Sequence, residues 1–272
     1  MIRLAVRVRR EDAELVLAEL LELAPGGVEE VDDGDVVEYA VYGAPGELPA
    51  LPALRAAAGE ALVDVVTSEV ADDWDRRWRE FHRPVEAGGL RVRAPWHDAR
   101  EGDVVIDPGQ AFGTGAHPTT RLCLELLAGL GDAGPRPPAA AVDLGCGSGV
   151  LAIAAARIGF APVLGLDCDP LAIEATLDNA RANGVRVAAR RFDLRAEGVP
   201  EAPLVLANLL RPLLLDVRFA GAPPRALIAS GLLEREGDEV AAAYAERFGL
   251  AERARATGDG WVALDLRAPE GR

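Results

Sequence analysis

The chain of 272 residues carries 29 Lys and Arg against 44 Asp and Glu, a formal net charge of -15 that argues against a nucleic-acid-binding protein, which would present a basic face. The acidity favours a basic partner, although it could equally serve only solubility. With 50% hydrophobic residues and no apolar run near the roughly 20 residues of a membrane span, we expect a globular protein of one large or two smaller domains.

Residues 1–67 have the pattern of a small α+β module. Residues 2–9 alternate apolar and polar side chains, as a half-buried strand does, and residues 11–24 change to the leucine spacing of an amphipathic helix. The same reasoning predicts strands over 28–31, 36–42 and 61–67 and a helix over 51–59. This order of elements is that of a ferredoxin-like unit, so we expect an independent N-terminal domain.

Residues 68–100 are predicted to connect this module to the rest of the chain. Trp74, Trp78 and Phe81 recur at the spacing of a helix, which Pro84 ends. The aromatic face could bind a partner, but we favour a linker helix that packs this face on a neighbouring domain. Short strands are expected over 90–94 and 104–107.

Residues 107–120 read Asp-Pro-Gly-Gln-Ala-Phe-Gly-Thr-Gly-Ala-His-Pro-Thr-Thr and run directly into an amphipathic helix. So many glycines and prolines before a helix N-terminus are typical of a loop shaped around a ligand. The alternative is a long structured turn in which Thr119 or Thr120 caps the helix.

From residue 140 onward, strands alternate with helices. We predict strands over 140–143, 163–168, 187–192, 204–207 and 226–230, and helices over 150–159, 170–182, 211–219 and 233–248. This alternation predicts a parallel sheet with helices on both faces, in which ligands bind at the carboxyl ends of the strands. The last two strands, over 250–256 and 261–267, flank Asp259-Gly260 and should form an antiparallel hairpin.

A glycine loop joins the first of these strands to its helix. Gly145, Gly147 and Gly149 follow Asp143 and precede an alanine-rich segment, so a ligand can approach main-chain N–H groups at a helix N-terminus. Glycine also marks ordinary strand–helix turns. Asp167 ends the next strand, where a carboxylate can accept hydrogen bonds from both ribose hydroxyls of a nucleoside, or lie exposed in a turn.

Two neighbours of Asp167 have simpler interpretations. Asp169 precedes Pro170 and is predicted to cap the next helix. Asp193, after the third strand, could receive an adenine amino group, but such a residue is more often a loop acid.

Nicotinamide dinucleotides and S-adenosyl-L-methionine both fit a strand, a glycine loop and a ribose-binding acid. The spacing Gly-x-Gly-x-Gly differs from the dinucleotide pattern Gly-x-Gly-x-x-Gly, no second mononucleotide-binding half follows, and the chain ends in an antiparallel pair. These three observations favour S-adenosyl-L-methionine.

The C-terminal part, residues 101–272, resembles a class I S-adenosyl-L-methionine-dependent methyltransferase, a Rossmann-like α/β fold. More narrowly, the chain resembles the PrmA family, which methylates the large-subunit ribosomal protein L11. The resemblance is carried by residues 107–120, 142–154, 165–170 and 207–210, and it extends through 74–78, 95–96 and 260–264.

The resemblance implies that Thr120, Gly145, Asp167 and Asn208 contact the cofactor, and we add Gly147 from the same glycine loop. It also implies that residues 112–115 close over the cofactor and that the N-terminal module captures the substrate protein. Asn208 follows a strand, so its amide oxygen could accept a hydrogen bond from the incoming amine, or the residue could cap the following helix.

No catalytic residue is assigned from the sequence, and His117 is expected to stabilise its loop and not to transfer a proton. Three cysteines, at positions 123, 146 and 168, lack the spacing of a zinc site and the density of a disulfide scaffold. We therefore expect that the protein binds no metal and that its thiols are reduced. We also expect a cytoplasmic protein, without a signal peptide, that acts as a monomer. Two further functions stay open: methylation of another protein, such as an electron-transfer flavoprotein subunit, and a non-catalytic ribosome-associated role.

Overall fold

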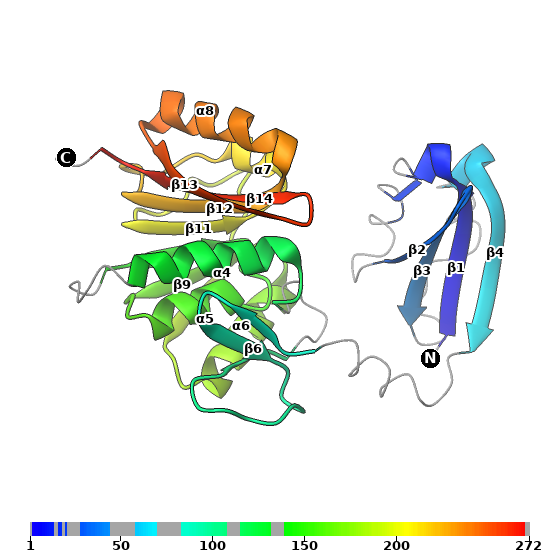
Figure 1. Cartoon of the computed structure of the whole chain (residues 1–272), viewed down its shortest axis with the longest axis horizontal. Coiled ribbons are helices and arrows are strands. Elements are labelled where there is room, and N and C mark those ends of the chain that lie inside the picture. Colours follow the sequence, from blue (N-terminus) through cyan, green and yellow to red (C-terminus); the bar gives the residue numbers. More distant parts are fainter. Residues whose placement is uncertain are drawn as a thin grey trace. The chain divides into compact units, whose positions relative to one another are not determined.

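The structure is a computed structural model of the chain, and residues 2–13, 16–17, 20, 28–43, 58–69, 83–107, 115–131 and 139–269 are described. The chain divides into two compact units, Met1–Phe81 and His82–Arg272 (Figure 1). The aromatic helix predicted around Trp74, Trp78 and Phe81 lies outside the described residues, as do almost all of the helix predicted over 51–59 and most side chains of the one over 11–24.

The N-terminal unit contains a four-stranded sheet in the order β2-β3-β1-β4, in which every neighbouring pair is antiparallel. Its strands are β1 (Ile2–Arg9), β2 (Glu29–Asp33), β3 (Val36–Gly43) and β4 (Leu62–Glu69), with short 3-10 turns η1 (Arg10–Asp12) and η2 (Gly59–Ala61). Alternate residues of β1 and β3, among them Leu4, Val6 and Tyr39, are buried in one cluster. The alternation in the sequence thus becomes one apolar face.

The C-terminal unit is built on a seven-stranded sheet in the order β10-β9-β8-β11-β12-β14-β13. Its first five strands in this order are parallel, and β14 is antiparallel to both β12 and β13. The strands are β8 (Ala141–Leu144), β9 (Val163–Asp167), β10 (Val187–Arg191), β11 (Leu204–Asn208), β12 (Ala226–Leu233), β13 (Ala251–Gly258) and β14 (Trp261–Arg267). Strand order reverses beside β8, which places a ligand-binding switch point between β8 and β11.

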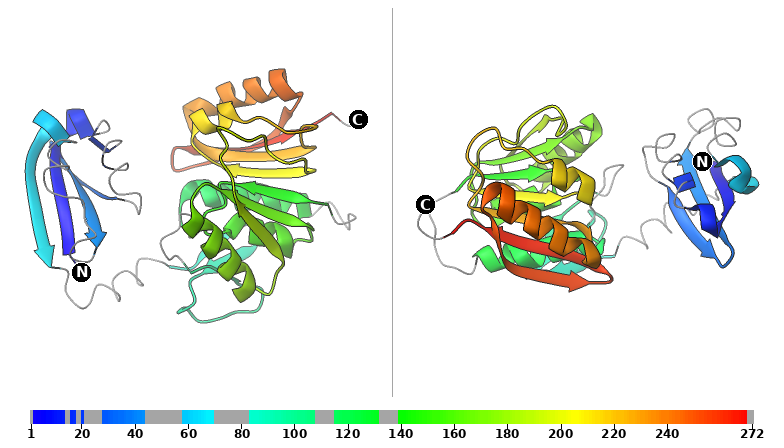
Figure 2. Two further views of the ribbon diagram at one scale, coloured as in Figure 1. Left: turned by 180° about the vertical axis from the view of Figure 1, so that it is seen from behind. Right: turned by 90° about the horizontal axis from the view of Figure 1, so that it is seen from above.

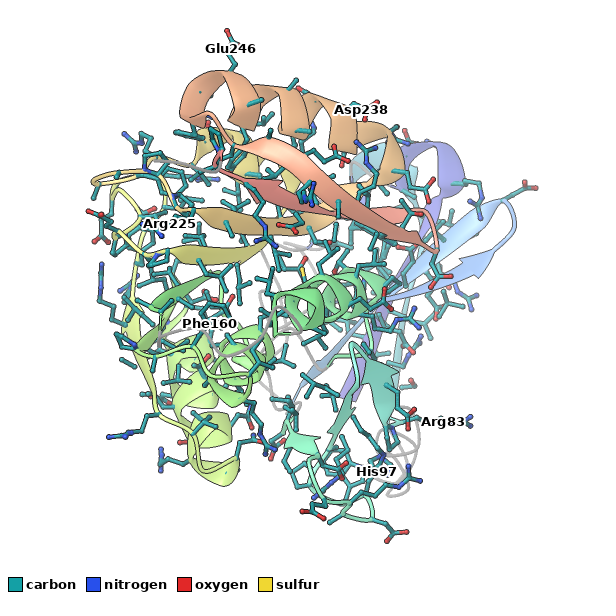
Figure 3. All side chains as sticks on the ribbon, turned by 60° about the vertical axis from the view of Figure 1, so that its left-hand side comes forward. Arg83, His97, Phe160, Arg225, Asp238 and Glu246 are labelled. Atoms are coloured by element: carbon teal, nitrogen blue, oxygen red, sulfur yellow. The ribbon has the colours of Figure 1, made fainter. Side chains whose placement is uncertain are left out.

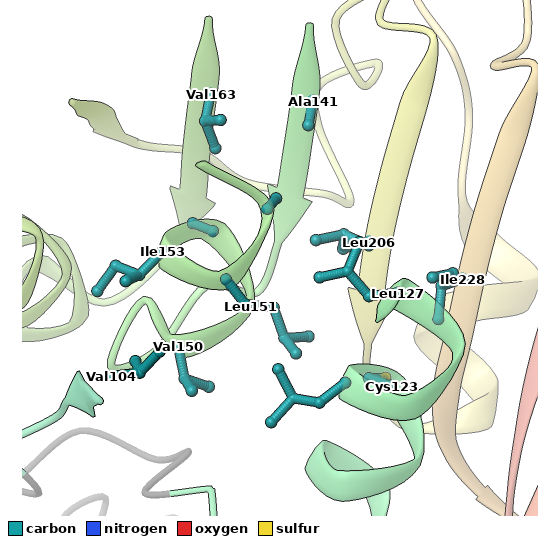
Figure 4. Packing of buried hydrophobic residues seen from close by; sticks show 14 of the residues in the cluster. Val104, Cys123, Leu127, Ala141, Val150, Leu151, Ile153, Val163, Leu206 and Ile228 are labelled. Carbon is teal, nitrogen blue, oxygen red and sulfur yellow. The ribbon is translucent and has the colours of Figure 1, made fainter. Parts of the chain in front are cut away.

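Helices cover both faces of this sheet, as the alternating sequence predicts (Figure 2). They are α4 (Pro118–Gly131), α5 (Val150–Arg157), α6 (Pro170–Ala182), α7 (Arg211–Asp216) and α8 (Gly237–Phe248). Side chains of α4 and α5, such as Leu127 and Ile153, meet Leu206 and Ile228 of the strands in one buried cluster (Figure 4). On the opposite face Val240 and other residues of α8 join a second cluster, while Asp238 and Glu246 point outward (Figure 3).

Strand β12 differs from its predicted form. It does not end at residue 230 but continues to Leu233, so α8 begins at Gly237 and not at residue 233. Gly231 has a φ of 85°, and the register between β12 and β14 shifts between Ala229 and Leu232. Beyond this irregularity Leu232 pairs with Val262, so long-range pairing extends the strand past the residue at which the sequence predicted its end.

Smaller departures occur elsewhere in this unit. Helix α7 ends at Asp216 and not at residue 219, and an unpredicted strand, β5 (Val85–Ala87), joins β6 (Leu90–Arg93) and β7 (Val104–Val105) in a small sheet. The C-terminal hairpin is confirmed: Asp259 and Gly260 have φ values of 53° and 80°, as a two-residue turn with two left-handed positions requires. Among the described residues, no helix has the length and apolar character to cross a membrane.

Candidate active site

The glycine loop lies at the carboxyl end of β8 and leads into α5. Gly145, Gly147 and Gly149 have φ values of 74°, 52° and 82°, a region that other residues rarely adopt. A Cβ on Gly145 would lie 2.5 Å from Cδ2 of Leu209, and one on Gly149 would lie 2.9 Å from Oγ1 of Thr176. The loop therefore requires glycine for its backbone conformation, and at Gly149 also for its close packing against Thr176.

Asp167 is bonded to this loop. Its Oδ2 accepts a hydrogen bond from the Gly147 N–H at 3.0 Å, and its Oδ1 accepts one from the Asp169 N–H at 3.0 Å. The carboxylate lies half-buried at the carboxyl end of β9, beside the end of β8. The structure thus brings together two residues that the sequence assigned to the cofactor.

The neighbouring acids have local roles. Asp169 caps α6, since its Oδ1 accepts a hydrogen bond from the Leu171 N–H at 2.8 Å, and Pro170 occupies the first turn, as predicted. Asp193 is exposed, and its Oδ1 accepts a hydrogen bond from the Arg195 N–H at 2.9 Å, which fits its interpretation as a loop acid.

Asn208 and Thr120 form a second pair. Asn208 ends β11, and its Nδ2 donates to Oγ1 of Thr119 at 3.1 Å and to Oγ1 of Thr120 at 3.3 Å, across 89 and 88 positions of sequence. Both threonines are 1% exposed in the first turn of α4. The alternative in which Asn208 caps the next helix is wrong, because α7 begins after Leu210 and has no side-chain cap.

His117 lies at the start of α4 beside these threonines. Its Nδ1 is 2.7 Å from Oγ1 of Thr119, and its ring meets the Trp261 ring edge-on at a centroid distance of 5.0 Å. Burial, and secondarily the nearby Arg121 charge, lower the pKa of His117 and so favour its neutral imidazole. These contacts fit the expected loop-stabilising role. Residues 108–114 of the predicted ligand loop, including the segment 112–114, lie outside the described residues.

Asp143 is a functional candidate that sequence reasoning left without a role. It is 1% exposed; its Oδ2 accepts a hydrogen bond from the Ala152 N–H at 2.9 Å, while its Oδ1 has no hydrogen-bond partner among the described residues. Burial raises the pKa of Asp143 to about 7, and the charge of Asp167 adds to the shift. The signal in the sequence was an acid inside an otherwise apolar strand.

Replacement of Asp143 by asparagine should stabilise the apoprotein more at high pH than at low pH. Because the folded-state pKa is raised from 3.8 to about 7, the ionised side chain subtracts stability progressively as the pH rises through this window. Relative to wild type, Asp143→Asn should gain about 2.5 kcal/mol between pH 5 and pH 8, measured by urea unfolding. The exposed Asp169→Asn should show no such gain; an equal difference for Asp143→Asn at both pH values would contradict the assignment.

The site fits a cationic nucleoside cofactor. A glycine loop at a helix N-terminus and an acid at the end of the next strand form an arrangement that suits a nucleoside, and Oδ1 of Asp143, buried and without a partner among the described residues, is suited to positive charge. With the antiparallel β14 inserted beside β12, these features define an S-adenosyl-L-methionine-dependent methyltransferase. Residues 50–269 match the family model described as ribosomal protein L11 methyltransferase (PrmA). The chain belongs to this family.

Relatives of known name cover both units of the chain. A ribosomal protein L11 methyltransferase of Ralstonia pickettii is 38% identical over 294 residues, which cover 95% of this chain and 96% of the relative. The enzyme of that name from Cupriavidus necator is 44% identical over 202 residues, or 71% of this chain and 64% of the relative. A crystal structure of a ribosomal protein L11 methylase from Lactobacillus delbrueckii aligns with a TM-score of 0.55 at 28% identity, covering 66% of this chain and 95% of that one.

Proposed function

We propose that this protein transfers methyl groups from S-adenosyl-L-methionine to amines of ribosomal protein L11, on lysine side chains, the N-terminus or both. One observation carries the proposal: the similarity to the Ralstonia pickettii enzyme extends over 95% of the chain. It therefore includes the N-terminal unit as well as the catalytic fold, and a methyltransferase with another protein substrate would be expected to differ in that unit.

We further propose that Thr120, Gly145, Gly147, Asp167 and Asn208 hold the cofactor. Two observations support this set: the hydrogen bond between Gly147 and Asp167, and the hydrogen bond between Asn208 and Thr120. Both pairs involve the carboxyl ends of adjacent strands, where α/β sheets bind ligands. When bound, S-adenosyl-L-methionine supplies an electrophilic methyl group on a positively charged sulfur, and the buried carboxylate of Asp143 would stabilise positive charge nearby.

Asn208 is proposed to orient the substrate amine. Its Nδ2 is occupied by the hydroxyls of Thr119 and Thr120, so its Oδ1 is the atom left to accept a hydrogen bond from an amine N–H. A lysine has an ordinary pKa of about 10.4 and must lose a proton before it attacks, which an apolar surrounding favours. Orientation of the two reactants can supply roughly 7–11 kcal/mol of the barrier reduction, so the chain needs no dedicated strong base.

We propose that the chain consists of a ferredoxin-like module over residues 1–67, a linker over 68–100 and the methyltransferase domain over 101–272. The strand order β2-β3-β1-β4 with antiparallel neighbours supports the first assignment. In this proposal the module captures the substrate protein. The net charge of -15 suits a basic ribosomal protein and requires no direct contact with nucleic acid. We expect the enzyme to act as a monomer, in the cytoplasm where its substrate is made.

The proposal can be tested with purified protein and methyl-labelled S-adenosyl-L-methionine. Label should appear on purified L11 and should stay absent from a basic control protein and from an electron-transfer flavoprotein subunit. If only the flavoprotein subunit were labelled, L11 would be refuted as the substrate, while the proposed reaction, methyl transfer to a protein, would stand. Cofactor binding without transfer to any of these proteins would favour the non-catalytic role.

A further inference from the structure

Helix α6 and its C-cap carry three polar side chains that bind main-chain groups of other segments. Thr176 and Asn179 lie in the helix and Asn183 is its C-cap, and their spacing of three and four residues places them along one face. Oγ1 of Thr176 donates to the Gly147 carbonyl oxygen at 3.0 Å. This face of α6 therefore reaches the glycine loop.

Asn179 binds two segments that are far apart in the sequence. Its Oδ1 accepts a hydrogen bond from the Asp107 N–H at 2.9 Å, and its Nδ2 donates to the Ser148 carbonyl oxygen at 2.9 Å. Asp107 begins the stretch 107–120 that leads to Thr120, and Ser148 lies within the glycine loop between Gly147 and Gly149. One amide thus fixes the backbone at two places that border the proposed cofactor site.

The burial of this amide raises the free-energy cost of losing its hydrogen bonds. Asn179 is 3% exposed and Ser148 is fully buried, so loss of the side chain would remove the bond to the Ser148 carbonyl at a place away from water. Such a loss typically costs about 1–3 kcal/mol per group. The effect would fall on the position of the backbone as well as on overall stability.

Asn183, one helical turn further, offers a matched comparison. Its Oδ1 accepts a hydrogen bond from the Val105 N–H at 2.9 Å, and its Nδ2 donates to the Val105 carbonyl oxygen at 2.6 Å. It therefore anchors strand β7 to α6 as Asn179 anchors Asp107. Among the described residues, its side chain makes no bond to the glycine loop, and its other partners are Arg157 and the main chain of Asn179.

We propose that Asn179 is a positioning residue for the methyl donor, which sets the start of the stretch 107–120 and the glycine loop at a fixed separation. The inference rests on the proposed cofactor residues Thr120 and Gly147, since these lie on the two segments that Asn179 joins. It assigns to α6 a role in cofactor affinity beyond its packing against the sheet.

The test compares Asn179→Ala with Asn183→Ala in the full-length protein by calorimetric titration with S-adenosyl-L-methionine and by thermal unfolding. Both variants lose an amide that bonds to main-chain groups, and because Asn183 is only half-buried, Asn183→Ala should lower the Tm by less than Asn179→Ala. Asn179→Ala should raise the Kd roughly tenfold or more, whereas Asn183→Ala should keep it within about twofold of wild type. An unchanged Kd in Asn179→Ala, or an equal rise in both variants, would overturn the proposal.

Asn179→Asp provides a second arm if the alanine variant does not fold. The aspartate still accepts a hydrogen bond from Asp107 but cannot donate to the Ser148 carbonyl, so the rise in Kd should persist; a wild-type Kd in this variant would overturn the proposal. These titrations contain no L11. A wild-type chain that binds the cofactor but leaves L11 unmethylated would therefore refute the proposed substrate and leave the role of Asn179 to be decided by the same Kd comparison.

Discussion

Asp167→Ala should raise the Kd for S-adenosyl-L-methionine by about two orders of magnitude or more. The substitution removes both acceptor oxygens proposed to bind the ribose hydroxyls, and it also removes the bond from Oδ2 to the Gly147 N–H. Hydrogen bonds to a charged group contribute roughly 1.5–3 kcal/mol each, and every 1.4 kcal/mol is a tenfold change in affinity. Calorimetric titration of the purified variant measures the effect.

Asp169→Ala is the matched control for this variant. Asp169 lies two residues further along, and its side chain caps α6 through the Leu171 N–H. Its loss should cost about 1 kcal/mol of stability, as loss of a helix cap does, and leave the Kd for the cofactor near the wild-type value. If Asp167→Ala bound the cofactor as tightly as Asp169→Ala does, Asp167 would have no place in the site.

Asn208→Ala should lower kcat for methyl transfer to L11 by roughly a hundredfold or more, with a smaller effect on cofactor affinity. The variant loses the oxygen proposed to orient the amine, together with the contacts to Thr119 and Thr120. Single-turnover transfer at saturating cofactor separates the methyl-transfer step from binding.

A conservative change at the same position sharpens this prediction. Asn208→Asp keeps an acceptor oxygen at the end of β11, so it should retain more activity than the alanine variant. Asn183→Ala, which removes the same kind of side chain from the C-cap of α6, should leave kcat close to wild type. A normal kcat in Asn208→Ala would refute the orienting role, and a weakened Kd with normal kcat would limit Asn208 to cofactor binding.

Local signals in the sequence were sufficient for much of the C-terminal fold. The bounds of α6 were predicted correctly because Asp169 and Pro170 form a cap and a first turn that act within a few residues. The final hairpin was predictable for the same reason, since Asp259 and Gly260 readily adopt the left-handed conformations of a tight turn. Elements set by neighbouring residues can be inferred from one sequence.

Features that depend on distant partners could not be inferred in this way. Strand β12 continues past Gly231 only because β14 pairs with the segment beyond it. The amide of Asn208 meets Thr119 and Thr120 only after the sheet and α4 have packed together. Asn179 resembles a solvent-facing residue of an amphipathic helix, and nothing in its spacing indicates that its two partners lie at Asp107 and Ser148.

The most direct test of L11 methylation by this chain is the intact mass of purified L11 after incubation with S-adenosyl-L-methionine and catalytic amounts of the wild-type protein. We expect L11 to gain discrete increments of one methylene each, which fragmentation places on amine nitrogens, and to gain none with Asp167→Ala. An unchanged L11 mass, under conditions in which titration shows that the wild-type protein binds the cofactor, would contradict the proposed function.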